Sequence, residues 1–302
     1  MVETTARVDA VDTSRDVSAI DSALARLCSE IPAVVPLQVA EAIRYTCRGG
    51  GKRLRGIMVA ASYRAAGGTG DAYLLSAAVE MLHAYSLAHD DLPCMDDDDV
   101  RRGRPATHRV YGVETTVIAG AVIIPFVAGA LARAGGNVWP ESTGRAMIAE
   151  LMGAAGASGM IGGQLADLAA EDAPVGSVGA LERIHRCKTG ALIAACCRAA
   201  GMAAGASDAS IRALGEYGSD VGLAFQIVDD VLDVTSTSAQ LGKTAGRDAA
   251  LGKSTYPGLL GVEGAMSRAH NLVREGCNVL AQAGLLTTEL RHLADLVITR
   301  TH

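Results

Sequence analysis

The chain has 302 residues, of which 49% are hydrophobic and 3% aromatic, and its formal net charge is -6. A core built from Ala, Leu, Val, Ile and Met with few aromatic rings favours packed helices and argues against a β-sandwich. The mildly acidic balance, without a basic tract, argues against DNA or RNA as a partner, because binding to a phosphate backbone requires clustered Lys and Arg.

The composition of the N-terminal segment disfavours a secretory signal and a transit peptide. Its first residues, MVETTARVDAVDTSRDV, contain four acids and no apolar stretch, whereas a secretory signal needs such a stretch and a transit peptide is poor in acids. The seven cysteines are odd in number and form no CxxC pair, which favours reduced thiols. We therefore expect a cytoplasmic protein with a disordered tail at 1–17 and one folded domain at 18–302.

Helical periodicity and helix-ending residues predict ten helices with short connections. They are expected at 18–30, 36–47, 53–66, 71–91, 113–134, 141–170, 178–203, 208–235, 263–283 and 287–299. Pro36 and Pro140 lie near two predicted starts, and glycine clusters mark several predicted ends. The absence of a composition shift between these helices favours a single all-α domain.

The longest apolar run is VIAGAVIIPFVAGALA at 117–132, which contains Pro125. Its 16 residues fall short of the roughly 20 that a membrane-spanning helix requires. We interpret the run as a buried core helix or as part of a subunit interface, and we expect no stable membrane insertion.

The first charged cluster is HDDLPCMDDDDVRRGR at 89–104, with six aspartates and three arginines. Pro93 should end or distort the helix there and let Asp96 lie beside Asp90, although a spacing of six residues would not align them on a regular helix. An acidic run at a helix end is often only a solvated surface, so this cluster alone does not define a site.

The second cluster lies in FQIVDDVLDV at 225–234, where Asp229 and Asp233 share one face of a nearly apolar helix. Because buried carboxylates are costly to desolvate, positive charge should face them, either from salt bridges or from a metal ion. Two such clusters and no matching His or Cys set suit Mg²⁺, which takes one or two protein carboxylates together with substrate phosphate oxygens.

Basic residues that could bind such phosphates occur at several places. Lys52, Arg53 and Arg55 open a helix after three glycines, where the N–H groups of the first turn favour an anion. The other candidates are Arg101, Arg102, Arg104, Lys188, Lys243 and Lys253. GRDAALGKS is not a P-loop, because five residues instead of four separate its glycines, and His89-Asp90 lacks the further histidines of a metal phosphohydrolase.

Six motifs, taken in order, resemble those of the trans-isoprenyl diphosphate synthases. They are GGGKRLR, HAYSLAHDDLPCMDDDDVRRGRPATH, GMIGGQLAD, KTG, FQIVDDVLD and LGKTAGRDAALGKSTYPGLLG. The resemblance extends from about residue 36 to the C-terminus. It implies an all-α single-domain prenyl synthase bundle around a central apolar cavity, usually as a homodimer, that condenses isopentenyl diphosphate with dimethylallyl or geranyl diphosphate.

The resemblance also implies roles for individual residues. Asp90 and Asp96 would hold two Mg²⁺ ions and Asp229 a third, or Mn²⁺ in their place, with Asp91 and Asp233 as further metal ligands. The allylic diphosphate would be bound by Arg101, Lys188, Thr189, Gln226 and Lys243. The isopentenyl diphosphate would be bound by Gly51, Lys52, Arg55, His83 and Arg102. Lys188, Asp90 and Asp229 would be the catalytic residues.

Tyr85 and Ser86 are the expected determinants of product length. They precede Asp90 by five and four residues, which places them about 6–8 Å along the helix from the metals. In this family an aromatic residue at the fifth position goes with farnesyl (C15) products, so we predict a C15 synthase, with geranylgeranyl (C20) synthase as the alternative. An ordinary core tyrosine is the other interpretation of Tyr85.

Two other protein classes fit the pattern less well. A class I terpene cyclase shares a first aspartate-rich motif, but its second metal motif is of a different type and it needs no isopentenyl diphosphate site. A non-catalytic partner subunit would be expected to lack part of one aspartate motif, and both motifs are intact here.

Overall fold

The computed structural model of the chain describes residues 11–173, 175–235 and 253–300. These form an all-α fold with one very short hairpin, as the composition predicted. The first elements are α1 (Ser14–Ser29), α2 (Leu37–Cys47), α3 (Leu54–Ala65), α4 (Tyr73–Asp90), β1 (Val100–Arg101), β2 (Arg104–Pro105), α5 (Thr107–Tyr111) and α6 (Val113–Ala134). They are followed by α7 (Glu141–Ala155), α8 (Met160–Asp172), α9 (Val178–His185), η1 (Arg186–Gly190), α10 (Ala191–Ala203), α11 (Asp208–Thr235), α14 (Tyr256–Gln282) and α15 (Thr288–Thr299).

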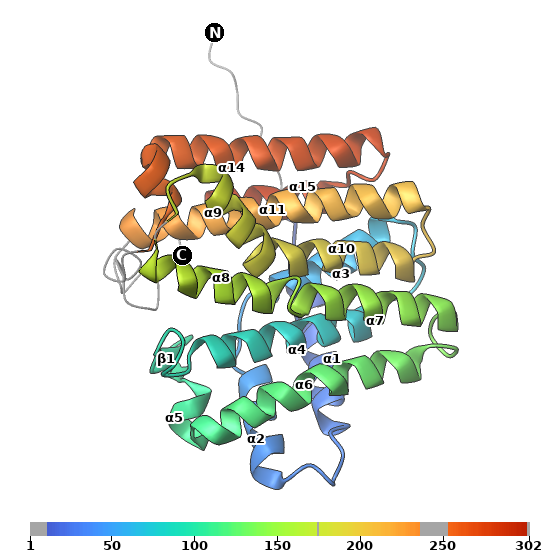
Figure 1. The fold of residues 1–302 in the computed structure, drawn as a ribbon. Coiled ribbons are helices and arrows are strands. Elements are labelled where there is room, and N and C mark those ends of the chain that lie inside the picture. Colours follow the sequence, from blue (N-terminus) through green and yellow to red (C-terminus); the bar gives the residue numbers. More distant parts are fainter. Residues whose placement is uncertain (1–10, 174, 236–252, 301–302) are drawn as a thin grey trace.

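The helices stack in successive rows, with α14 at one side, α11 and α10 next, and α4 and α6 at the other side (Figure 1). Two apolar clusters form the core, and α10 contributes to both: Leu192 and Cys196 pack in one, Ile193 and Cys197 in the other. A helix that is apolar all round must be buried on every side. The position of α10 therefore joins the two halves of the bundle.

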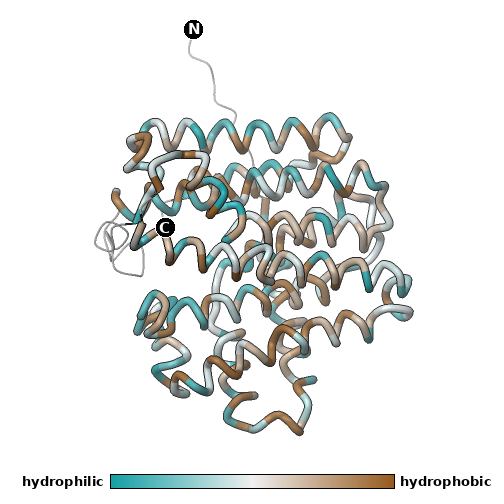
Figure 2. The backbone as a smooth tube through the Cα atoms, viewed as in Figure 1, coloured by the Kyte–Doolittle hydropathy of each residue, from teal (hydrophilic) through white to brown (hydrophobic). Residues whose placement is uncertain are grey.

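Helix α6 continues through Pro125 without a break and has the bounds expected from the sequence, 113–134. Among the described helices, α6 has the length and composition to cross a membrane, but it packs on α2, α4 and α7. Figure 2 shows hydrophobic residues along much of α6. Val117 and Ile118 remain 42% and 51% exposed, so the helix both contributes to the core and presents an apolar stripe.

Two predicted helices are interrupted. The helix expected at 141–170 is divided into α7 and α8 by a turn at 156–159, and the helix expected at 178–203 contains the π-helical turn η1. The turn at 156–159 reads GASG, a glycine signal that the prediction passed over, whereas η1 keeps the chain helical and so produces no end signal.

Other boundaries also differ from the expected ones. Helix α1 begins at Ser14 rather than at residue 18, and the Ser14 N–H donates to the Asp12 carboxylate over 2.9 Å. Helix α14 spans Tyr256–Gln282, but its backbone is not helical at Gly261 (φ 70°, ψ 165°). A short first piece, in which Thr255 accepts the Gly258 N–H, therefore precedes the helix expected from residue 263. Helix α5 and the hairpin, whose strands have two residues each, are too short to give a periodic signal.

Candidate active site

A cavity of about 850 Å³ opens among α4, α6, α8, η1 and α11. The sequence-predicted residues that line it are Arg55, His83, Tyr85, Ser86, Asp90, Asp96, Arg101, Arg102, Lys188, Thr189, Gln226 and Asp229. Apolar side chains from α6 and α8, among them Ile124, Ile161 and Leu165, complete the wall. One space thus combines opposed charges with an apolar surface, which suits an amphiphilic ligand with a charged head.

The turn after α4 brings the first aspartates together as predicted. Helix α4 ends at Asp90, and the Asp96 N–H donates to the Asp90 carbonyl over 2.8 Å. Burial raises the pKa of Asp90 to about 6, and the negative charge of Asp96 adds to this effect while Lys188 opposes it. Asp90 and Asp96 therefore form a carboxylate pair whose charge needs a positive partner.

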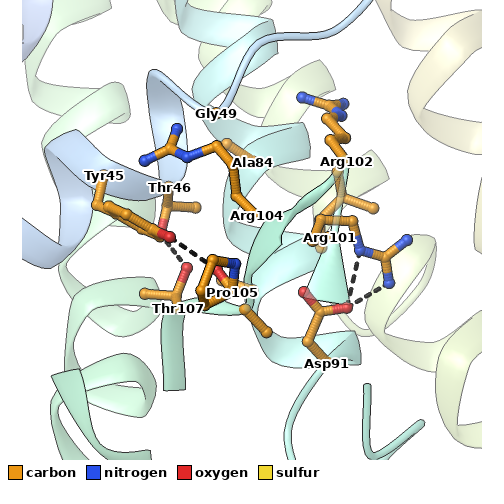
Figure 3. A pocket seen from close by; sticks show the side chains of 13 residues that line it. Tyr45, Thr46, Gly49, Ala84, Asp91, Arg101, Arg102, Arg104, Pro105 and Thr107 are labelled. Carbon is orange, nitrogen blue, oxygen red and sulfur yellow. Dashed lines mark hydrogen bonds and ion pairs between the residues drawn. The ribbon is translucent and has the colours of Figure 1, made fainter. Parts of the chain in front are cut away.

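Asp91 points away from the large cavity, unlike Asp90 and Asp96. Its side chain is 2% exposed, and the Arg101 Nε donates to Asp91 Oδ1 over 2.9 Å. Figure 3 shows this pair beside a smaller cavity of about 30 Å³, with Arg101 and Arg102 turned in different directions. In this arrangement Asp91 fixes the guanidinium of Arg101 at the cavity wall.

The second aspartate motif also divides into different positions. Asp229 lines the cavity, and Arg300 Nη2 lies 2.7 Å from its Oδ1 while the guanidinium stacks over Phe225 at 3.7 Å. Asp230 accepts the Tyr256 N–H over 3.0 Å and so joins α11 to the start of α14. Asp233 is 3% exposed and does not line the large cavity.

The π-helical turn η1 directs Lys188 and Thr189 toward the cavity. Lys188 Nζ donates to Asp167 Oδ2 over 2.6 Å, and Thr189 Oγ1 donates to Gln226 Oε1 over 2.9 Å. Desolvation alone would lower the pKa of Lys188, but the carboxylates of Asp167 and Asp90 outweigh it and leave that pKa raised. Lys188 thus remains a cation inside the cavity wall.

Helix α8 approaches η1 closely because residue 163 is glycine. A Cβ at Gly163 would lie 2.2 Å from the Lys188 backbone nitrogen, closer than any side-chain atom can approach. Gly163 therefore determines how near the α8 side chains can come to Lys188.

Lys253 lies among three carboxylates at the same wall. Its Nζ is 3.0 Å from Glu171 Oε1, 3.5 Å from Asp96 Oδ1 and 3.6 Å from Asp167 Oδ2. Asp167 and Glu171 are not among the residues predicted from the sequence. Residues 164, 167, 168 and 171 share one helical face, and this spacing is the local signal that places the two acids together. Arg300 gave no local signal, because its contact with Asp229 depends on the tertiary fold.

The glycine-rich segment before α3 lies against the hairpin. Gly51 has φ 127°, and a Cβ there would lie 2.6 Å from the Arg102 Cζ. The Arg102 guanidinium donates to the Gly50 carbonyl, which holds both segments together. Arg53 is 6% exposed and its Nε is 2.8 Å from Asp21 Oδ1, so it serves the fold rather than the cavity.

Two of the residues predicted to bind isopentenyl diphosphate present polar atoms without partners. Arg55 Nε and His83 Nδ1 are buried and have no hydrogen bond within the described part of the chain. Burial lowers the pKa of His83 well below its usual value, and the charges of Arg55 and Arg102 add to this. His83 is therefore neutral near pH 7, and Arg55 and Arg102 supply the positive charge that an anion would meet.

Tyr85 lies on α4, one turn before His89. The two rings meet edge to face with centroids 5.4 Å apart, and the Tyr85 hydroxyl donates to the Ala155 carbonyl over 3.4 Å. Its side chain is 3% exposed and lines the cavity. Ser86 lines it as well, and its hydroxyl donates to the His83 carbonyl.

The donor set fits a metal that relies on its substrate for most of its ligands. Within 11–173, 175–235 and 253–300 no three His, Cys, Asp or Glu side chains group as a closed metal site. Asp96 Oδ1 is buried and has no hydrogen-bond partner among the described residues, although Lys253 lies near it. Single carboxylates that face a cavity are what Mg²⁺ uses when phosphates complete its octahedron. Lys243 lies outside the described residues.

Comparisons with known proteins identify the family of the chain. The polyprenyl synthetase family profile matches residues 37–279. A farnesyl diphosphate synthase of Escherichia coli (strain K12) is 44% identical over 290 residues, covering 93% of this chain and 95% of that protein. A dimethylallyltranstransferase of Fischerella ambigua (strain UTEX 1903) is 42% identical over 92% of this chain and 80% of its own length.

Plant relatives and solved structures also match. A chloroplastic geranylgeranyl pyrophosphate synthase of Arabidopsis thaliana is 43% identical over 84% of this chain and 72% of its own length. A crystal structure of an FPP/GFPP synthase from Zymomonas mobilis superposes with a TM-score of 0.80 at 32% identity, covering 94% of this chain and 95% of that chain. The chain therefore belongs to the polyprenyl synthetase family, as a trans-isoprenyl diphosphate synthase.

Proposed function

We propose that this protein is a prenyltransferase that condenses isopentenyl diphosphate with dimethylallyl or geranyl diphosphate and releases farnesyl diphosphate. The observation that carries the proposal is the single cavity, in which Asp90, Asp96 and Asp229 face Lys188 and an apolar wall. A diphosphate head needs the charged groups, and a growing isoprenoid chain needs the apolar surface. The similarity to synthases of the same product supports this assignment.

Within this proposal, Asp90, Asp96 and Asp229 hold Mg²⁺, with three ions in total, and Mn²⁺ can replace them. A metal held by these carboxylates would supply the positive charge that stabilises the allylic diphosphate as a leaving group. Asp91 and Asp233 act behind these residues: Asp91 holds Arg101, and Asp233 packs inside the bundle.

The diphosphates divide between two sets of basic residues. The allylic diphosphate is bound by Arg101, Lys188, Thr189, Gln226 and Lys243. The isopentenyl diphosphate is bound by Gly51, Lys52, Arg55, His83 and Arg102. Lys243 lies outside the described residues, but Arg55, His83, Lys188 and Gln226 come from different helices and Arg101 and Arg102 from the hairpin turn, so both substrates can be held against one another in a fixed orientation. The apolar wall excludes water, which would otherwise capture the allylic cation.

The direct test of this function uses purified protein with Mg²⁺, isopentenyl diphosphate and each allylic diphosphate in turn. We expect C15 diphosphate from the dimethylallyl and geranyl substrates and little use of the farnesyl substrate, with products identified by mass spectrometry. A C20 product would favour the geranylgeranyl alternative, to which plant relatives are similar. A cyclised hydrocarbon, or no product, would favour a terpene cyclase or a partner subunit.

Product length should depend on the Tyr85 ring. Tyr85→Ala removes the ring that lies against His89, so we expect the main product to lengthen from C15 to C20. Tyr85→Phe is the matched control: it keeps the ring, loses only the bond to Ala155, and should still give C15. Chromatography of the dephosphorylated products measures the result, and an unchanged product distribution in Tyr85→Ala would remove Tyr85 as the determinant.

We further propose that the protein acts as a cytoplasmic homodimer whose subunits meet along the apolar stripe of α6. Introducing a charge by Ile118→Glu should convert the dimer to monomer, because an unpaired carboxylate in an apolar interface is costly to desolvate. Val138→Glu replaces another exposed apolar residue, 56% exposed and beyond the end of α6, and should leave the dimer intact. Light scattering after gel filtration gives the masses, and a dimeric Ile118→Glu variant would exclude this face.

A further inference from the structure

Gln164 on α8 is a buried amide without a hydrogen bond. It lines the large cavity and is 7% exposed. Neither Oε1 nor Nε2 finds a partner within the residues that the structure describes. Leaving a buried polar group unsatisfied costs about 1–3 kcal/mol, so an apolar residue of the same size would serve the fold better. This cost suggests that the amide has a function in the occupied cavity.

Apart from His83, the uncharged polar side chains compared with Gln164 have hydrogen bonds within the protein. Gln226 accepts from Thr189 and donates to Asp230 over 3.4 Å, while Ser86 donates to the His83 carbonyl. His83, with its unpaired Nδ1, lies near the positive charges of Arg55 and Arg102. Gln164 is therefore the amide in the described wall whose oxygen and nitrogen are both uncommitted.

The position of Gln164 places it next to the reacting end of a substrate. It follows Gly163, whose missing side chain lets α8 touch the Lys188 backbone. It precedes Asp167, the acceptor of Lys188, by three residues, or about 4.5 Å along the helix axis. Ile161 and Leu165 of the same helix belong to the apolar wall. A diphosphate near Lys188 would leave its first isoprene carbons at the level of Gln164.

We propose that Gln164 is a catalytic residue whose amide oxygen stabilises the positive charge on the allylic carbons. This inference rests on the proposed function. When the C1–O bond of the allylic substrate breaks, its electron pair leaves with the diphosphate and the positive charge spreads over C1 and C3. The double bond of isopentenyl diphosphate then supplies the pair for the new C–C bond, and the proton lost afterwards passes to the released diphosphate. Gln164 undergoes no covalent change.

The physical reason is electrostatic. A carbonyl dipole that is already oriented and shielded from water stabilises a developing cation more strongly than a solvated dipole does, because no solvent has to reorganise around it. Phosphate oxygens are concentrated near the metals and lysines, whereas the charge on C3 lies further along the chain. An amide oxygen on the apolar side of Lys188 can reach that second position.

The test uses calorimetry in the presence of Mg²⁺ to compare two diphosphate ligands. The isoprenoid chain of the first, called the cationic ligand, carries a positive charge, and that of the second, called the neutral ligand, carries none. The cationic ligand is a geranyl diphosphate analogue with a protonated amine in place of C3, and the neutral one is geranyl thiolodiphosphate, whose C–S bond does not ionise. Gln164→Met keeps the size of the side chain and removes the dipole. We expect Gln164→Met to raise the Kd of the cationic analogue at least tenfold and to leave the Kd of the neutral analogue within about twofold of the wild type. It should also lower kcat more than it changes KM.

Two further variants make the result specific. Gln164→Glu keeps an acceptor oxygen and loses the N–H donors, so it should retain or increase affinity for the cationic analogue. Gln282→Met is the matched control, because Gln282 is exposed on α14 and does not line the cavity. Gln282→Met should change the Kd of neither ligand. Since the amide has no partner in the described fold, Gln164→Met should unfold at the same temperature as the wild type or at a higher one.

The inference is overturned if Gln164→Met weakens the binding of both analogues equally or of neither. It is also overturned if this variant unfolds at a much lower temperature than the wild type. If Gln164→Glu loses affinity for the cationic analogue, the inference is also overturned, because that result assigns the role to the N–H donors. If the wild type forms the C–C bond but its preference for the cationic analogue is the same as that of Gln164→Met, this inference alone is refuted. A wild type that binds neither analogue and forms no product refutes the proposed function and this inference with it.

Discussion

Replacing Asp90 by Asn is expected to lower kcat/KM by about 10³-fold and, at the same time, to stabilise the protein in the presence of a chelator. The loss of activity follows because the amide carries no charge for Mg²⁺, and removing one preorganised charge interaction from a transition state costs about 10²–10³-fold or more. Steady-state kinetics at saturating Mg²⁺ measures this change.

The gain in stability follows from the pKa of Asp90, which burial raises from 3.8 to about 6. The folded protein then holds this proton more tightly than the unfolded chain does. The stabilisation is complete below about pH 3.8 and is lost as the pH rises through about 6. Ionised Asp90 therefore costs the folded state about 1–3 kcal/mol at neutral pH without metal.

Thermal unfolding in EDTA measures this effect. Asp90→Asn should raise the Tm by several degrees at about pH 7.5, and the difference from the wild type should shrink toward about pH 4.5, where the wild-type side chain begins to be neutral in both states. Glu263→Gln neutralises an exposed acid on α14 and should leave both activity and Tm unchanged. A lower Tm for Asp90→Asn would show that the carboxylate has a stabilising partner.

Gly163→Ala is expected to damage the active site although the new side chain is a single methyl group. Its Cβ would meet the Lys188 nitrogen at 2.2 Å and the Lys188 Cα at 2.6 Å, and backbone atoms cannot move aside as the end of a side chain can. Separation of α8 from η1 by about 1 Å should lower kcat/KM by about 10²-fold. Overpacking should cost a further 1–3 kcal/mol, roughly, in the free energy of unfolding.

The chain offers a matched control on the neighbouring helix. A Cβ at Gly153 of α7 would meet no atom within 4 Å. Gly153→Ala should therefore keep full activity and gain up to about 1 kcal/mol from the better helix propensity of alanine. Urea unfolding and kinetics of both variants test the contrast, and similar behaviour of the two would show that α8 can shift at no cost.

The sequence predicted those parts of the site that depend on local chemistry. Pro93 and the spacing of Asp90 and Asp96 indicated a turn that brings these carboxylates together, and the Asp96 N–H bond to Asp90 confirms it. The all-α class and the family were also predicted correctly, because helix periodicity and ordered motifs are local signals.

What the sequence could not supply was the direction of individual side chains. Asp91 neighbours Asp90 but turns to Arg101, and Arg300 reaches Asp229 only through the tertiary fold. The uncommitted amide of Gln164 has no local signature either, since its meaning depends on which partners the fold fails to provide. Such contacts are decided by packing between distant helices, which periodicity does not encode.

The widened turn η1 has a consequence for how such a site can arise in evolution. A π-helical turn closes with one more residue than an α-helical turn. Here it separates α9 from α10 without a loop, so Lys188 is re-aimed while α10 stays in the core. Inserting a single codon is thus enough to point a functional side chain in a new direction around the helix axis. Along this segment, ancestry should be traced through gains and losses of one residue as much as through exchanges.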